Sequence, residues 1–243
     1  MRRVNICNLG KLLFAAGVLI LFFLSSCNMN CIQGEGPVVS ADKNVDDFSR
    51  LEVSVPAEVT ISIGDQYYVG IEAQQNVIEA VSAKVEGKTL VLKASPCVST
   101  DEIFRISIIV PGLSEISING SGSVTSKDML VSDEMEVNIN GSGDARIDLK
   151  AGEVEADING SGDIFLSGSA NEVDIEINGS GDVKALGLTT KNVRVEINGS
   201  GDVEINVSEK LTVDIAGSGN VRYSGNPKVK SSVNGSGEVS EIN

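Results

Sequence analysis

Ile118-Asn119-Gly120-Ser121-Gly122 is the first of seven nearly identical segments in this chain of 243 residues. Successive copies are 18 to 21 residues apart, and the later ones begin at Ile139, Ile158, Ile177, Ile197, Ile215 and Val233. A period near twenty, carried by strand-forming residues and a pair of glycines, is typical of a solenoid whose coils stack on one another. The repeats therefore predict an all-β fold, a single-chain parallel β-helix.

Apolar and polar residues alternate between the glycine corners. Val173, Ile175 and Ile177 precede one corner, and Val183 and Ala185 follow it, with polar or charged residues between them. Because neighbouring side chains of a strand point to opposite faces, each apolar set lies on one face. Stacked at a fixed step, these sets form the columns of a narrow core. The expected coil is right-handed, although the sequence alone does not fix its handedness.

The Asn-Gly-Ser-Gly corner has a mechanical explanation. Glycine reaches positive φ without steric cost, and stacked asparagine amides can hydrogen-bond from coil to coil. We expect such a ladder, interrupted by Ala216, from Asn119, Asn140, Asn159, Asn178, Asn198 and Asn234.

Calcium binding is a weaker alternative for the same corner, because Gly-Ser-Gly-Asp resembles the loops of calcium-binding β-rolls. Those rolls draw their ligands from repeats of half this length. The sequence therefore favours the structural interpretation, and the weak calcium candidates are Asp144, Asp163, Asp182 and Asp202.

The first residues have the pattern of a bacterial lipoprotein signal. Arg2, Arg3 and Lys11 flank an apolar run, and Leu24-Ser25-Ser26-Cys27 resembles a lipobox. We predict a signal peptide over residues 1–26 and lipidation of Cys27, which would anchor the protein to the membrane. The remaining predicted segments are a tether over 27–44, an N-terminal β module over 45–112 with a weak helical pattern at 74–84, and the β-helix over 113–243.

Composition excludes several functions. Cys31 and Cys97 can pair as a disulfide in an oxidising compartment. The chain has no histidine and a net charge of −15, which becomes −18 without the three basic residues of the signal. Such an acidic surface disfavours nucleic acid. The lack of a histidine base and the short turns argue against catalysis, so we expect no catalytic residues, cofactor or metal. A β-helical polysaccharide-active enzyme is the unfavoured alternative.

Three stretches together carry a family resemblance. They are the repeated Ile-Asn-Gly-Ser-Gly-Asp, Phe48 ahead of Leu51-Glu52-Val53, and Val110-Pro111-Gly112-Leu113 ahead of the first repeat. They resemble the auto-transporter adhesin head GIN domain family of Bacteroidetes lipoproteins over nearly all of residues 45–243. The resemblance implies a β-helical envelope lipoprotein with an adhesive role, and it brings no catalytic residues.

Two functional hypotheses follow. In the first, the protein is a non-enzymatic adhesin whose ligand is an unidentified protein or glycan. In the second, it is a structural envelope protein that associates with itself through the C-terminal rung, because an open coil after Gly235 would leave backbone groups unpaired. An outer-membrane lipoprotein is expected in both. Asn28-Met29-Asn30 lacks the acidic residues linked to surface export, so surface and periplasmic orientations both stay open.

Overall fold

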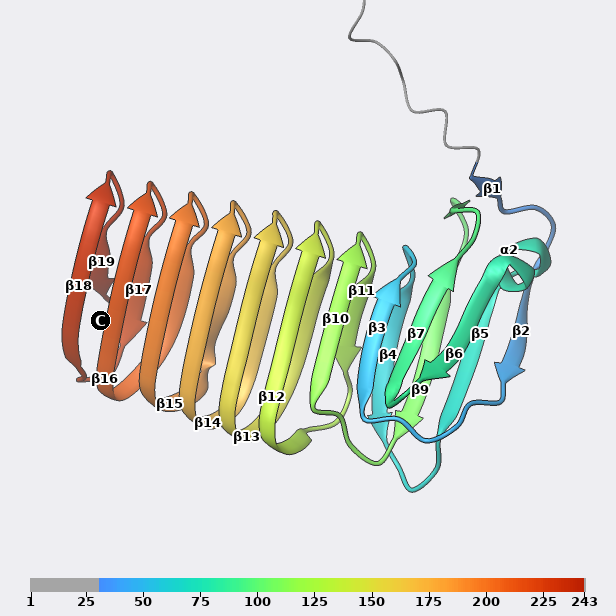
Figure 1. The fold of residues 1–243 in the computed structure, drawn as a ribbon, viewed down its shortest axis with the longest axis horizontal. Helices are drawn as coiled ribbons and strands as arrows, with labels where there is room; N and C mark the ends of the chain where they lie inside the picture. Colours follow the sequence, from blue (N-terminus) through green and yellow to red (C-terminus); the bar gives the residue numbers. More distant parts are fainter. Residues whose placement is uncertain (1–30, 243) are drawn as a thin grey trace, which may run out of the picture. The chain divides into compact units, whose positions relative to one another are not determined.

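The computed structural model describes residues 31–242, and these form a solenoid of stacked coils with parallel strands in register (Figure 1). The predicted parallel β-helix is confirmed. The predicted signal peptide and the lipidation site Cys27 lie outside the described residues. No helix between residues 31 and 242 has the length and apolar character needed to cross a membrane.

Each coil runs from one glycine corner to the next. One strand leaves a corner, bends at its middle and runs to the next corner beside the previous coil, as in β13 (Asp144–Gly160), β14 (Ile164–Gly179), β15 (Val183–Gly199) and β16 (Val203–Gly217). β12 (Leu130–Gly141) forms only the later part of such a coil. Two facing layers result, which we call sheet A, leading into the corners, and sheet B, leaving them.

Sheet A contains the C-terminal halves of β12 to β16 together with β3 (Arg50–Ser54), β7 (Thr89–Ala94), β10 (Glu115–Gly120) and β18 (Lys228–Gly235). Sheet B contains the N-terminal halves of β13 to β16 together with β4 (Glu58–Ile63), β9 (Arg105–Val110), β11 (Ser123–Ser126), β17 (Val221–Ser224) and β19 (Val239–Glu241).

The core lies between the two layers and consists of columns of aliphatic side chains. Ile158, Ile177 and Ile197 occupy one register position and are fully buried. Burial of such a side chain contributes about 1.5–3 kcal/mol relative to exposure. Since a single coil has nothing to cover this surface, the coils are stable only as a stack.

The N-terminal end departs from the repeat. The chain makes β3 and β4, then β5 (Tyr68–Gln74), α2 (Gln75–Ala80), β6 (Val81–Glu86), β7, β8 (Val98–Ser99) and β9. It then returns so that β10 pairs with β3, and β3 therefore lies between β7 and β10. The N-terminal β module thus stacks in register with the repeats.

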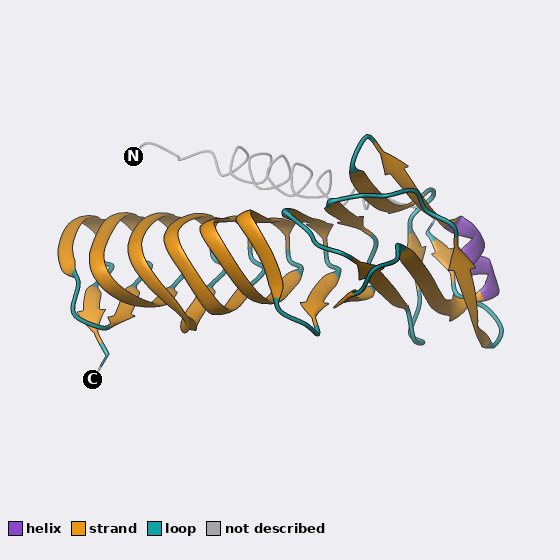
Figure 2. Cartoon of the chain, turned by 90° about the horizontal axis from the view of Figure 1, so that it is seen from below, coloured by secondary structure: helices purple, strands orange, loops and turns teal. Residues whose placement is uncertain are grey.

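A cap closes this end of the core. Val77 and Ile78 of α2 are buried, β6 pairs antiparallel with β7, and β5 pairs antiparallel with β9. Figure 2 shows α2 at one end of the solenoid and the last coil at the other. The helix is shorter than the pattern at 74–84 indicates, because from Val81 onward the alternation of apolar and polar residues fits a strand against β7.

The predicted tether over 27–44 is wrong in its extent. Within it, β1 (Ile32–Gln33) pairs with β8, and β2 (Val38–Lys43) pairs antiparallel with β5. The physical reason is that Val39 and Ala41 alternate with polar residues and pack against the core, which the glycine-rich composition of the preceding residues obscured.

The C-terminal end has no comparable cap among the described residues. All eight residues of β18 are exposed, and among residues 31–242 its strand partner is β16, on its inner edge. Val229 and Val233, which continue the core columns, are 41% and 39% exposed.

Candidate functional site

The asparagines of the corners form an exposed row along sheet A. Asn140 Nδ2 donates to Asn119 Oδ1 at 3.2 Å, and Asn198 Nδ2 donates to Asn178 Oδ1 at 3.2 Å. Asn178 Nδ2 also donates to Asn159 Oδ1 at 3.3 Å and to Glu176 Oε1 at 2.7 Å. These bonds join Asn119 to Asn140, and Asn159 through Asn178 to Asn198, so the row stabilises the stack.

Ala216 interrupts the row. It lies in register between Asn198 and Asn234, where a hollow of about 120 Å³ opens beside it. The backbone of the sixth corner thus keeps the register of the row. It has no side-chain amide there to link Asn198 to Asn234 by hydrogen bonds.

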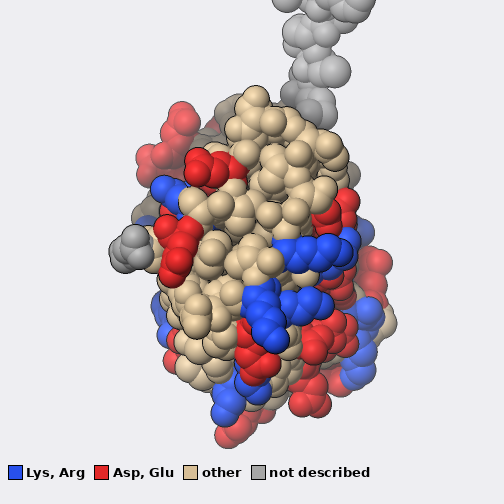
Figure 3. All heavy atoms as spheres, turned by 90° about the vertical axis from the view of Figure 1, so that its left-hand side faces the viewer, with Lys and Arg blue, Asp and Glu red and all other residues tan. Residues whose placement is uncertain are grey.

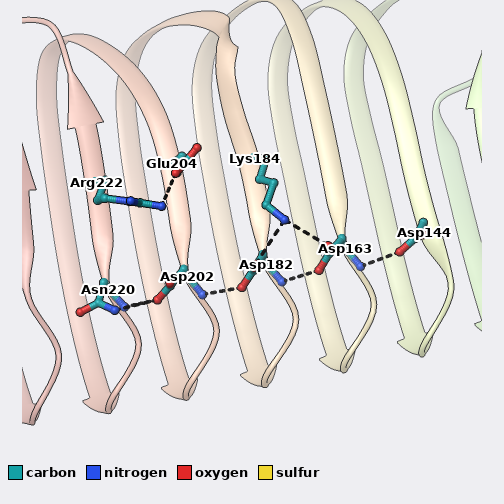
Figure 4. Close-up of polar contacts among 8 residues, drawn as sticks. All are labelled: Asp144, Asp163, Asp182, Lys184, Asp202, Glu204, Asn220 and Arg222. Atoms are coloured by element: carbon teal, nitrogen blue, oxygen red, sulfur yellow. Dashed lines mark hydrogen bonds and ion pairs between the residues drawn. The ribbon is translucent and has the colours of Figure 1, made fainter. Parts of the chain in front are cut away.

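The aspartates after each corner form a second, half-buried column on sheet B (Figure 4). Asp163 Oδ1 accepts from the backbone N–H of Asp182 at 3.0 Å, and Asp182 Oδ1 accepts from that of Asp202 at 3.0 Å. Asn220 continues the column, with its N–H 2.8 Å from Asp202 Oδ1. Each carboxylate thus satisfies a backbone donor of the next coil that the sheet ladder leaves without a partner.

This role of the aspartates was not apparent from the sequence, although Asn220 contained a signal of it. An amide at the same position as four carboxylates indicates that a hydrogen-bond acceptor is needed there, whereas a negative charge is not.

The weak calcium candidates therefore lie in register but have other partners. Lys184 Nζ lies 3.2 Å from Asp163 Oδ2 and 3.3 Å from Asp182 Oδ2, so an ammonium group occupies the position between these two carboxylates. Burial alone would lower the pKa of Lys184, but hydrogen bonds to Asp163 and Asp182 outweigh it and raise the pKa. Across the described range, no three acidic or cysteine side chains are grouped closely enough to hold a metal ion.

Cys31 and Cys97 lie at disulfide distance, with their sulfur atoms 2.00 Å apart. The pair fastens β1 beside β8, where Ile32 N also donates to Cys97 O. This bridge ties the segment that follows the predicted lipidation site to the loop between β7 and β9.

Phe165 is the one aromatic side chain on the outer face of sheet B between β11 and β17. The Arg146 guanidinium lies 4.2 Å and the Lys184 ammonium 5.1 Å from the centre of the Phe165 ring. A shallow hollow of about 350 Å³ surrounds these residues and includes Ser167 and Asp148. Sequence reasoning missed this group, because its members lie about 19 residues apart and meet only when the coils stack.

Sheet A carries a concentration of carboxylates on β12 to β14. Partial burial is the main cause that raises the pKa of Asp157 to about 6, and repulsion from Glu155 and Glu176 adds to it. Burial also raises the pKa of Asp174, against the opposing effect of Arg194. These carboxylates thus disfavour one another's charged forms, and a cationic surface that met them would relieve this repulsion.

Comparison with known proteins gives a family and a fold. Residues 47–227 match the model of the family described as "Putative auto-transporter adhesin, head GIN domain". No curated protein is significantly similar to the chain.

Solved structures from Bacteroides and Parabacteroides species share the solenoid. A putative adhesin from Bacteroides fragilis is similar at a TM-score of 0.82 and 24% identity, covering 87% of this chain and 100% of the other. A putative adhesin from Parabacteroides distasonis gives 0.72 and 24%, covering 87% and 99%. A protein of the same species described as a putative lipid binding protein gives 0.69 and 23%, with the same coverage. These likenesses show the fold.

Proposed function

The chain belongs to the auto-transporter adhesin head GIN domain family, and from this membership we propose that it is a lipid-anchored binding protein of the cell envelope that acts without catalysis. Its ligand is an unidentified protein or glycan. The recognition surface is the group of Phe165, Arg146 and Lys184 on sheet B, which we call the Phe165 patch.

The position of Phe165 carries this proposal. Aromatic and arginine side chains are enriched at interfaces, and a few such residues contribute most of the binding energy once a partner covers them. Phe165 offers apolar area, and Arg146 offers N–H donors beside it. The nearest carboxylate to Arg146 is that of Asp144, whose Oδ2 lies 3.8 Å from the guanidinium. This contact is weak, so the guanidinium stays available to a ligand. A ligand with carboxylate or hydroxyl groups next to an apolar surface fits this arrangement.

The arrangement of the remaining polar groups supports a binding role over a catalytic one. The chain has no histidine, and the carboxylates of the corner column accept backbone hydrogen bonds. A binding surface needs only outward side chains held in fixed positions, which a stack of coils supplies. Aliphatic side chains fill the core, so a lipid ligand would have to bind on the outside as well.

The test compares binding of the full chain and its variants to arrays of envelope proteins and glycans. We expect Phe165→Ala and Arg146→Ala each to weaken binding of the recovered ligand by about 10-fold or more, as for truncation of an interface residue that contributes over 1 kcal/mol. Arg222→Ala is the matched control, because Arg222 is also an exposed sheet B cation, paired with Glu204. Equal binding by all three variants would refute the Phe165 patch.

Anchoring requires a separate experiment. Cys27→Ala should move the protein from the membrane fraction to the soluble fraction and abolish incorporation of a fatty-acid analogue. Two or three acyl chains hold a protein stably on a membrane, and the variant would carry none of them. Unchanged membrane association of Cys27→Ala would contradict the lipid anchor and leave the binding surface untouched.

Orientation is tested on intact cells. Biotinylation of lysines such as Lys184 and Lys191, together with protease treatment, should label and degrade a surface-displayed protein while a periplasmic marker stays intact. Protection of both proteins until the outer membrane is opened would place the protein in the periplasm, and its ligand would then be an envelope component.

A further inference from the structure

Exposed charges of opposite sign lie at opposite ends of one row on sheet A. From β13 onward the row crosses β13, β14, β15, β16 and β18 in register, and its members there are Glu153, Glu172, Asn192, Lys210 and Lys228. Two carboxylates are thus followed by a neutral amide and then by two ammonium groups, all five at the same height on adjacent coils. Glu134 of β12 precedes Glu153 in the same row.

The neighbouring row also has two carboxylates at one end and a lysine at the other. It runs through Glu155, Asp174, Arg194, Thr212 and Lys230. Its central cation is already compensated, because Arg194 lies 3.9 Å from Asp174 and 3.3 Å from Glu196. Seen from the C-terminal end, basic side chains gather beside acidic ones on the near coils (Figure 3).

The outer charges of both rows have no opposite partner within the part of the chain that the structure describes. No salt bridge there includes any of the three acidic or three basic residues, which are Glu153, Glu155, Glu172, Lys210, Lys228 and Lys230. A shallow hollow of about 390 Å³ lies between them, lined at one end by Glu153 and Glu172 and at the other by Lys210 and Lys230.

We propose that this surface docks a second copy of the chain, with the two sheets A face to face and the two solenoids antiparallel. A two-fold axis that runs along β15, over both Asn192 and Arg194, exchanges the two ends of each row and sets each of these two residues opposite its own copy. It brings Glu172 opposite Lys210 of the second copy and Glu153 opposite Lys228. In the neighbouring row it brings Glu155 opposite Lys230, and every pair occurs twice.

The position of the closest contact follows from a third row nearer the corners. There, Glu176 and Asp214 are both acidic and would face each other across the same axis. The two copies therefore approach most closely at the edge away from the corners, where the hollow lies, and diverge toward the corners.

The open edge of β18 is a poorer docking surface for a second copy. Lys228 and Lys230 are charged residues of the edge strand itself, and Glu241 of β19 is in register with the inward-facing Tyr223. Charges at an edge, and inward-pointing charges above all, are the devices by which proteins prevent edge-to-edge pairing. These charges are compatible with self-association through the outer face of sheet A. They disfavour association through the edge of the C-terminal rung.

The expected dimer is weak. Five coils spaced about 4.8 Å apart and strands of about seven residues give a footprint of roughly 25 by 20 Å, or about 500 Å² per copy. Stable complexes bury about 800 Å² per partner. Association held by exposed ion pairs also falls with salt, so dimers should form at high concentration and low ionic strength.

A charge swap tests the proposal independently of the adhesive role. The full chain in non-ionic detergent is followed by sedimentation at 20 mM and 500 mM salt. The wild type should dimerise at low salt, whereas Lys210→Glu with Lys228→Glu, and separately Glu153→Lys with Glu172→Lys, should each remain monomeric. An equimolar mixture of the two variants should recover a dimer, because each acidic row then meets a basic one.

The mixture distinguishes docking from damage, since misfolded variants would not recover on mixing. Lys127→Glu with Lys150→Glu is the control of equal charge change, because both lysines are exposed and lie outside the two rows; it should dimerise like the wild type. A wild type that is monomeric at every concentration and salt, or a mixture that stays monomeric, would overturn the proposal.

Discussion

The Asp163 carboxylate accepts a hydrogen bond from the backbone N–H of Asp182, one coil further along, at 3.0 Å. The same contact recurs from Asp144 to Asn220 and joins each corner to the next. It explains why an acceptor recurs at this position in nearly every repeat, and it predicts how the stack responds when one acceptor is removed.

Replacement of Asp163 separates the acceptor from its charge. Asp163→Ala leaves the Asp182 N–H half-buried and unpaired, so it should lower the free energy of unfolding by about 1–2 kcal/mol. Asp163→Asn keeps an acceptor, as Asn220 does naturally, and should lower it by less than half as much. Urea unfolding of the two variants measures the difference, and equal losses would show that the contact contributes nothing specific.

The glycine corner tolerates no side chain. A Cβ on Gly162 would lie 1.9 Å from the carbonyl oxygen of Gly143 in the coil before. Gly162→Ala must therefore separate two coils, and we expect a loss of about 3 kcal/mol or more, in the range of severe overpacking. Gly112, whose Cβ would meet nothing within 4 Å, provides the comparison. Gly112→Ala should leave the thermal midpoint within a degree or two, and a similar fall for both variants would contradict the steric argument.

The gap at Ala216 can be filled. Ala216→Asn places an amide between Asn198 and Asn234, next to a hollow of about 120 Å³. One or two added hydrogen bonds at an exposed position should raise the free energy of unfolding by about 0.5–1 kcal/mol. Calorimetry should show a higher midpoint than for Ala216→Ser, whose side chain is too short to join the row. A midpoint at or below that of the wild type would mean that the amides of the row do not stabilise the stack.

Asp157 makes stability depend on pH. Its pKa is raised to about 6 in the folded protein, so between about pH 4 and 6 the folded state retains a proton that the unfolded state has lost. The contribution of Asp157 to the free energy of unfolding is therefore fully present below about pH 4, and it falls as the pH rises through 6. Asp157 is only partly buried, so solvent screening reduces the effect to about 1 kcal/mol.

The measurement compares Asp157→Asn with the wild type at pH 4 and pH 7. The variant lacks the charge, so it should exceed the wild type in stability at pH 7 and lose the advantage at pH 4. Asp214→Asn, an exposed carboxylate of the same row, serves as the control and should show a smaller difference. A pH-independent gap between Asp157→Asn and the wild type would contradict the assignment.

The coils, their corners and the alignment of Asn119 with Asn140 follow from the sequence, because a fixed period dictates which residues stack. The order of the N-terminal strands does not follow from it. Alternation shows that residues 50–54 form a strand, but it cannot show that this strand pairs with both 89–94 and 115–120. Choice of partner there depends on long-range packing, with no repeat to reveal it.

The candidate binding groups were hidden for a related reason. Arg146, Phe165 and Lys184 are unremarkable one by one, and the pattern appears only when they are read down a column of the stack. The charge rows of sheet A can be read in the same way once the register is known. Glu153 and Lys228 are 75 residues apart in the chain, so no local motif connects them.

The return of the chain to lay β10 beside β3 has a consequence for biosynthesis. The capped N-terminal end is complete, with its core closed on one side, once about 120 residues have been made. Each later coil can then fold next to a finished template and has only to add its strands to the nearest edge. Growth in one direction, one coil at a time, would also let the gene gain or lose a repeat without disturbing either the cap or the coils already in place.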